Sequence, residues 1–89
     1  MNNEYKEKLA RLVNGSALED NEKKLWQLFL KMALPEENEA VYDAANEGQE
    51  NLQLLTKYLG DKIRDMKKDN QVAWQKIAQE EKELAKFLD

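Results

Sequence analysis

The chain has 89 residues, of which 42% are hydrophobic and 36% are charged, and its net charge is −4. It contains no cysteine and no histidine, which excludes disulfides, thiolate chemistry, the usual zinc sites and the commonest general base. Leu, Ala, Glu, Lys and Gln dominate and no segment alternates in the manner of a strand, so the sequence predicts an all-α fold. We expect one small helical domain over residues 1–89, a compact bundle of four to five helices with a thin core, no cofactor and no metal.

The sequence also bears on where the protein acts. The first ten residues, MNNEYKEKLA, lack a basic stretch followed by an apolar one. The longest apolar run is about half of the roughly 20 residues that span a bilayer. We therefore expect a cytoplasmic protein without a membrane partner, and the negative net charge disfavours general binding to nucleic-acid phosphates.

The first helix is expected over residues 3–13, and Asn14-Gly15 predicts a left-handed turn after it. The start of the second helix is ambiguous. Ser16 and Glu19 together form a capping box, whereas Asp20 can cap a start four residues later. Either start gives a helix that ends near residue 33.

The second helix contains LWQLFLKMAL, residues 25–34, in which eight of ten residues are apolar. On a helical wheel the apolar arc covers about 240°, compared with roughly 100° on an ordinary surface helix. Two interpretations stay open. Either this helix is central and enclosed by the others, or Trp26 and Leu30 remain partly exposed and meet a partner protein or a second copy of the chain.

Pro35 favours the first turn of a third helix over residues 35–48 and disfavours a helical conformation at Leu34. A fourth helix is expected over residues 51–68. The apolar stripes of the two are nearly in phase, so one long helix is possible, but a helix of 33 residues would measure about 50 Å. Residues 46–51 are all polar around Gly48, and we favour a break there.

The last helix is expected from Asn70, which caps it, to the C-terminus. Its predicted inward residues are Trp74, Ile77, Ala78, Leu84, Ala85 and Leu88. Glu81 falls near the centre of this apolar face. We expect it to lie at a rim, with its carboxylate in water or paired with a lysine. Across the chain, the residues expected in the core include Leu28, Phe29, Leu55, Leu59, Ile63, Ile77 and Leu84.

Charges are unevenly distributed between the third and fourth helices. Residues 36–50 contain six acids and no Lys or Arg, and five of the acids project to one side: Glu36, Glu39, Asp43, Glu47 and Glu50. The fourth helix aligns Lys57, Arg64 and Lys68 on one flank. The two flanks either neutralise each other in a hairpin, or the acids bind a basic partner. A calcium loop starting at Asp43 fails, because Ala45 and Leu54 occupy ligand positions.

These patterns favour a non-catalytic protein interaction or regulatory module over an enzyme. The residues expected to make the contact lie on the second and third helices: Trp26, Leu30, Glu36, Glu39, Asp43 and Glu47. The alternative is a nucleic-acid-binding regulator with a helix-turn-helix at residues 67–79. There Gln71, Gln75, Lys76 and Gln79 would face the bases, while Arg64, Lys67 and Lys68 contact phosphates.

Overall fold

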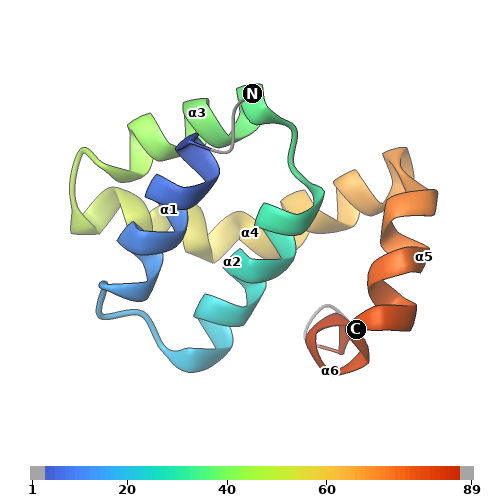
Figure 1. The fold of residues 1–89 in the computed structure, drawn as a ribbon. Helices are drawn as coiled ribbons and strands as arrows, with labels where there is room; N and C mark the ends of the chain where they lie inside the picture. The colour runs from blue at the N-terminus through green and yellow to red at the C-terminus, as the bar shows by residue number, and fades with distance from the viewer. Residues whose placement is uncertain (1–3, 87–89) are drawn as a thin grey trace.

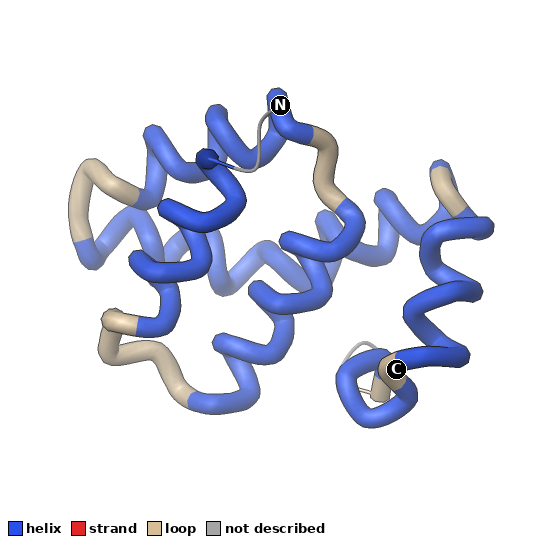
Figure 2. The backbone as a smooth tube through the Cα atoms, viewed as in Figure 1, coloured by secondary structure: helices blue, strands red, loops and turns tan. Residues whose placement is uncertain are grey.

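The computed structural model describes residues 4–86, and residues 84 and 85 by their backbone alone. The described chain is all helical, without strands, which confirms the predicted all-α fold. Five helices have ten residues or more and one has four: α1 (Glu4–Asn14), α2 (Asp20–Met32), α3 (Pro35–Ala45), α4 (Gln49–Asp69), α5 (Gln71–Glu80) and α6 (Lys82–Ala85). Short loops join them (Figure 2), and the Cα radius of gyration is 12.3 Å.

The helices pack around two central elements, α2 and the long helix α4. Figure 1 shows α1 and α2 on one side of the molecule, with α4 crossing behind them and α3 along the upper edge. Helix α1 packs against α2 and α3, while α4 packs against α2, α3 and α5. Helices α5 and α6 form the C-terminal side, and α6 returns to contact α2. Helix α2 is therefore the common neighbour of α1, α4, α5 and α6.

The link between α1 and α2 is fixed by short polar side chains. The Ser16 hydroxyl donates to the carbonyl of Val13 (2.6 Å), and the Gly15 N–H donates to the carbonyl of Arg11 (2.9 Å). Gly15 does not have a positive φ, so the predicted left-handed turn is wrong; these two hydrogen bonds end α1 instead. Helix α2 begins at Asp20, near the later predicted start, and the Glu22 carboxylate accepts a hydrogen bond from the Glu19 N–H (2.9 Å).

Helices α3 and α4 are separate, as the polar segment around Gly48 predicted. Helix α3 begins with Pro35, and Leu34 before it is extended, with ψ 158°. The Asn51 side-chain amide stabilises the connection, because it donates to the carbonyl of Ala44 (3.2 Å) and to the Glu47 carboxylate (2.7 Å). The two helices therefore lie side by side as a hairpin rather than forming one long rod.

The C-terminal helix is shorter than predicted. Helix α5 ends at Glu80, and Glu81 leaves the helical conformation with φ −130° and ψ 55°, which turns the chain so that α6 contacts α2. The expectation of one helix to the C-terminus is wrong for this reason. The Glu81 carboxylate lies 3.0 Å from the Lys31 ammonium of α2, and both side chains are half-exposed. The expected position of Glu81, at a rim and paired with a lysine, is confirmed.

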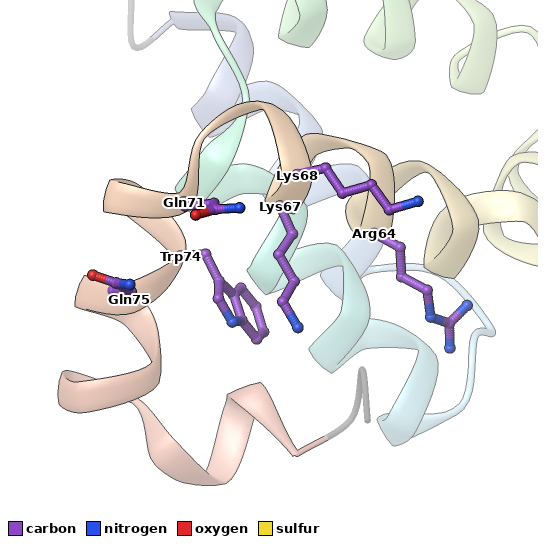
Figure 3. A pocket seen from close by; sticks show the side chains of 6 residues that line it. All are labelled: Arg64, Lys67, Lys68, Gln71, Trp74 and Gln75. Carbon is purple, nitrogen blue, oxygen red and sulfur yellow. The ribbon is translucent and has the colours of Figure 1, made fainter.

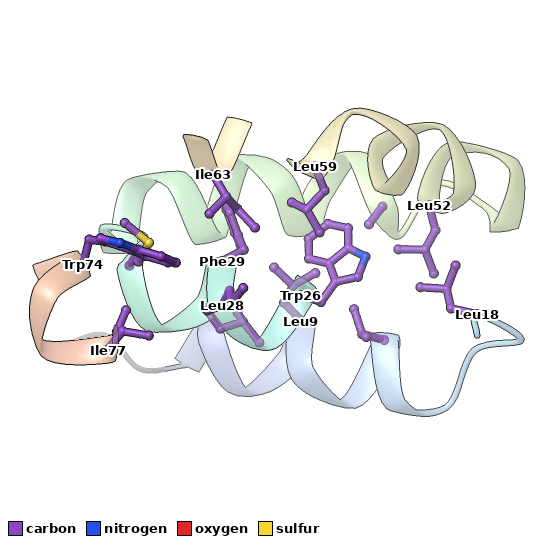
Figure 4. Packing of buried hydrophobic residues seen from close by; sticks show 14 residues of the cluster. Leu9, Leu18, Trp26, Leu28, Phe29, Leu52, Leu59, Ile63, Trp74 and Ile77 are labelled. Carbon is purple, nitrogen blue, oxygen red and sulfur yellow. The ribbon is translucent and has the colours of Figure 1, made fainter. Parts of the chain in front are cut away.

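One hydrophobic cluster connects α1, α2, α3, α4 and α5, and Leu18 in the loop before α2 also belongs to it (Figure 4). Five of the seven residues predicted for the core are buried: Leu28, Phe29, Leu59, Ile63 and Ile77. Leu55 is half-buried at the edge of the cluster, and the side chains of Leu84, Ala85 and Leu88 lie outside the described residues. Trp74 is buried as predicted, whereas Ala78 is half-buried.

A buried hydrogen-bond pair joins α2 to α4 inside this cluster. The Trp26 indole N–H donates to the Thr56 hydroxyl (2.8 Å), which donates in turn to the carbonyl of Leu52 (2.7 Å). Trp26 also meets Phe29 edge to face, with ring centroids 5.6 Å apart. The hydroxyl satisfies an indole N–H that would otherwise be buried without a partner.

Candidate interaction surfaces

Helix α2 does not offer the surface that its wide apolar arc suggested. Trp26 is 1% exposed and Leu30 is 8% exposed, so the expectation that they remain partly exposed is wrong. The physical reason is that α1, α4 and the α5–α6 pair pack against α2 on the sides where Trp26 and Leu30 lie. The other interpretation, in which α2 is the central helix, agrees with the structure.

The predicted acidic residues do lie on the surface. Glu36, Glu39, Asp43 and Glu47 are all exposed on or just after α3. The ion pair that joins α3 to α4 uses other residues, because the Lys62 ammonium lies 3.5 Å from the Glu37 carboxylate. The basic flank predicted to neutralise these acids faces elsewhere on α4, and Arg64 pairs with Asp61 on its own helix (3.2 Å).

An apolar groove opens between α3 and α4, and we call it the α3–α4 groove. Its cavity volume is about 260 Å³. Trp26 and Phe29 of α2 reach it from the core, Val41 contributes the α3 wall, and α4 supplies most of the remaining surface. The residues that line it are Trp26, Phe29, Val41, Leu54, Leu55, Tyr58, Leu59 and Lys62.

Two large apolar side chains stand at the edge of this groove in water. Leu54 is 55% exposed and Tyr58 is 56% exposed, and their spacing of four residues places them side by side on α4. Sequence reasoning missed both, because neither lies on the apolar stripe of α4 that runs through Leu52, Leu59 and Ile63 and is buried. The available signal was an apolar pair at i and i+4 that lies off that stripe.

The apolar surface continues beyond the groove toward the end of α4. A second hollow is lined by Met32, Leu34, Glu37, Met66, Asp69 and Asn70, and Leu34 within it is 61% exposed. The Glu37–Lys62 ion pair lies between the groove and this hollow, since Glu37 and Lys62 each line one of them. From Leu54 to Met66 the surface follows α4 for about 18 Å.

Charged side chains of both signs lie near this apolar strip. Tyr42 contacts Tyr5 of α1 (ring centroids 5.9 Å apart), so α1 covers that side of α3. Val41 marks the side of α3 that faces the groove, and at 100° per residue Glu36 and Asp43 point away from it. On α4, Asp65 lies seven residues after Tyr58 and shares its face, while the Lys57 ammonium lies 5.7 Å from the Tyr58 ring centroid. The groove is therefore apolar inside, with charges of both signs beside it.

A different pocket lies on the other flank of α4, where α4 meets α5, and we call it the cationic pocket. Its cavity volume is about 380 Å³. It is lined by Arg64, Lys67, Lys68, Gln71, Trp74 and Gln75 (Figure 3). The Lys67 side chain runs beside the Trp74 indole, and its ammonium lies 4.8 Å from the ring centroid.

This junction differs from the predicted helix-turn-helix. Asn70 alone separates α4 from α5, and its side chain caps α5 by accepting from the Ala73 N–H (3.2 Å). A helix-turn-helix uses a turn of about three to four residues. The predicted phosphate-contacting residues and Gln71 and Gln75 do come together here, but they line a pocket rather than a projecting recognition helix.

The described residues show neither a metal-binding cluster nor a membrane-spanning helix. Within residues 4–86 no group of three or more carboxylates is placed to hold a metal ion. None of the helices in that range has the length and apolar character needed to cross a membrane.

Comparisons with known proteins identify no relative of this chain. No protein-family model, no curated protein and no solved structure matches the chain. The function is accordingly argued from the surfaces themselves.

Proposed function

We propose that the protein is a non-catalytic interaction module that binds an amphipathic, basic helix of a partner protein in the α3–α4 groove. The observation that supports this proposal is the exposure of Leu54 and Tyr58, at 55% and 56%, beside a groove lined almost entirely by apolar side chains. The groove contains one charged group, Lys62, which is already paired with Glu37. Its walls offer apolar contact rather than a pair of groups that could transfer a proton.

The shape of the surface favours a helix as the ligand. The apolar strip from Leu54 to Met66 is about 18 Å long, which corresponds to about three helical turns. A helix placed in such a groove presents apolar residues at i, i+3 or i+4, and i+7. The ion pair between Glu37 and Lys62 interrupts the strip in its middle, so a polar residue of the ligand is expected at that point.

The overall charge of the α3–α4 hairpin favours a basic ligand. Glu36, Asp43 and Glu47, on or just after α3, and Asp65 of α4 are all exposed, so a basic ligand approaches a mainly negative surface. Exposed charges of this kind contribute mainly to the rate and orientation of encounter rather than to final affinity. The apolar contacts of Leu54 and Tyr58 would then supply most of the binding free energy.

The proposal is tested with two synthetic helical peptides that share one apolar face of leucines and differ only in carrying lysines or glutamates on the other positions. The lysine peptide is expected to bind and to shift the indole N–H signal of Trp26, which lines the groove. The Leu54→Gln variant should bind about tenfold more weakly at unchanged melting temperature. Val72→Gln is the matched control, because Val72 is 80% exposed and lies outside the groove.

Three results would contradict the proposal: no binding of either peptide, equal binding of both, or equal losses in Leu54→Gln and Val72→Gln. Sedimentation of the wild type tests whether a second copy of the chain, rather than a partner protein, occupies the α3–α4 groove. A dimer that the Leu54→Gln change dissociates would assign the groove to self-association instead of a basic helix.

The alternative proposal is a nucleic-acid-binding regulator. Its support is the presence of Arg64, Lys67 and Lys68 together at the cationic pocket. The single-residue link at Asn70 argues against a helix-turn-helix geometry. The net charge of −4 also weakens a nonspecific attraction to nucleic acid.

A further inference from the structure

The cationic pocket has an unusual set of lining residues for this chain. Eighteen of the 89 residues are acidic, yet among residues 4–86 no carboxylate lines the pocket. Its polar side chains are three cations and two amides, all of which donate hydrogen bonds. The local charge is therefore opposite to that of the whole molecule.

Two of the three cations have no carboxylate partner nearby. Arg64 is paired with Asp61, but neither Lys67 nor Lys68 lies within ion-pair distance of a carboxylate anywhere in the described range 4–86. Lys67 instead covers the face of the Trp74 indole, with its ammonium 4.8 Å from the ring centroid. Adjacent lysines repel each other, and an anion between them would remove that repulsion.

The N-terminus of α5 adds to this electropositive environment. Helix α5 has ten residues and begins at Gln71, which lines the pocket. The Ala73 N–H is occupied by the Asn70 side chain, whereas the N–H groups of Gln71 and Val72 precede the first intrahelical acceptor. The positive end of the helix dipole favours an anion at the same place.

We propose that the cationic pocket binds a phosphate group, carried either by a free oligophosphate or nucleotide or by single-stranded nucleic acid. A phosphate accepts several hydrogen bonds at once and carries the charge needed to neutralise two lysines, which a single carboxylate does not. When the phosphate binds, the Lys67 ammonium moves toward it and leaves the Trp74 ring. The uncovered indole face is then available for stacking with a base.

This inference does not depend on the proposed function. The two surfaces use different flanks of α4, and each contains one of the two tryptophans: Trp26 lines the α3–α4 groove and Trp74 lines the cationic pocket. A ligand of one surface is therefore distinguished from a ligand of the other by which indole signal moves. Failure at one site leaves the test of the other intact.

The experiment follows the two indole N–H signals of the full ¹⁵N-labelled chain during separate additions of inorganic pyrophosphate, ATP and oligo(dT). The expected result is a saturable shift of Trp74 with little change at Trp26, weakening as salt is raised. A response to pyrophosphate and ATP identifies a free phosphate compound as the ligand, and a response to oligo(dT) alone identifies single-stranded nucleic acid. No response to any of the three probes would overturn the proposal.

Charge-removing variants show whether the pocket itself is responsible. Lys67→Gln and Lys68→Gln should each weaken the response about tenfold, because each removes a charge-assisted hydrogen bond. Lys57→Gln is the matched control; it removes the same charge from the same helix, about 15 Å from Lys67. Equal weakening in Lys57→Gln and Lys68→Gln would show nonspecific attraction and would contradict a site in the pocket.

Discussion

The molecule contains two tryptophans in two contrasting regions. Trp26 lies among α1–α4, is 1% exposed, and has its N–H bonded to Thr56 and its ring packed edge to face on Phe29. Trp74 lies in the C-terminal pair α5–α6, is 8% exposed, and has its ring covered by the flexible side chain of Lys67. The first is fixed by neighbours from separate helices, whereas the second is covered by a group that can move away.

This difference shows that similar burial can have different meanings. The enclosure of Trp26 comes from rigid packing and one satisfied hydrogen bond, so it contributes to stability. The enclosure of Trp74 comes partly from an ammonium on a flexible stem, which costs little to displace. Stability is therefore expected to concentrate in α1–α4, and ligand-dependent change at the α4–α5 junction.

The largest expected effect comes from removing core volume in each region. Phe29→Ala should lower the free energy of unfolding by about 3 to 5 kcal/mol, because Phe29 is fully buried among α1, α2 and α4. Trp74→Ala should lower it by less, since the flexible Lys67 side chain that covers its ring can move into the vacated space. Urea denaturation of both variants gives the two values. A larger loss in Trp74→Ala would reverse the contrast between the regions.

A smaller effect is expected from the hydrogen bond that fixes Trp26. Thr56→Val keeps the shape of the side chain but leaves the buried indole N–H without an acceptor, which should cost about 1 to 3 kcal/mol. Thr56→Ser keeps the hydroxyl and serves as the control. Thermal melting of both variants measures the difference. If Thr56→Val were as stable as the wild type, the hydrogen bond would not be what fixes Trp26.

The smallest effect is expected where α6 meets α2. Glu81→Gln removes the ion pair with Lys31, and because both side chains are half-exposed the loss should stay below about 1 kcal/mol. Urea denaturation at low and at high salt measures it, and the difference from the wild type should shrink as salt rises. A loss of several kcal/mol would mean that this contact, rather than the apolar cluster, holds the C-terminal pair in place.

Local signals were enough to predict most of the helices. Pro35 at the start of α3, the polar residues around Gly48 and the capping residue Asn70 each act over a few neighbouring residues, and the structure shows a boundary at each. The end of α5 was not predictable in this way. Residues 80–82 are Glu, Glu and Lys, which are good helix formers, and the bend at Glu81 depends on the tertiary contact between α6 and α2.

The candidate site was less predictable than the fold. A helical wheel shows how wide an apolar arc is, but it does not show how many helices cover it; Trp26 and Leu30 are buried for that reason. Conversely, Leu54 and Tyr58 stay exposed because no helix within the described residues packs over that side of α4. The burial of Asn38 in α3 was also not predictable from the sequence. This polar residue is 3% exposed, and its Oδ1 has no hydrogen-bond partner in the described structure.

Because α2 packs against helices from both ends of the chain, its burial can be completed only late in synthesis. Helix α2 ends at Met32, whereas α4 ends at Asp69 and α6 at Ala85, so of its covering helices only α1 is made before it. At about 5 to 20 residues per second, roughly 3 to 10 s separate the appearance of α2 from that of α6. During that interval the side chains of α2 that α4, α5 and α6 bury in the folded protein, such as Trp26 and Leu30, lack those neighbours. Burial of α2 is thus completed only when the C-terminal part of the chain has been made.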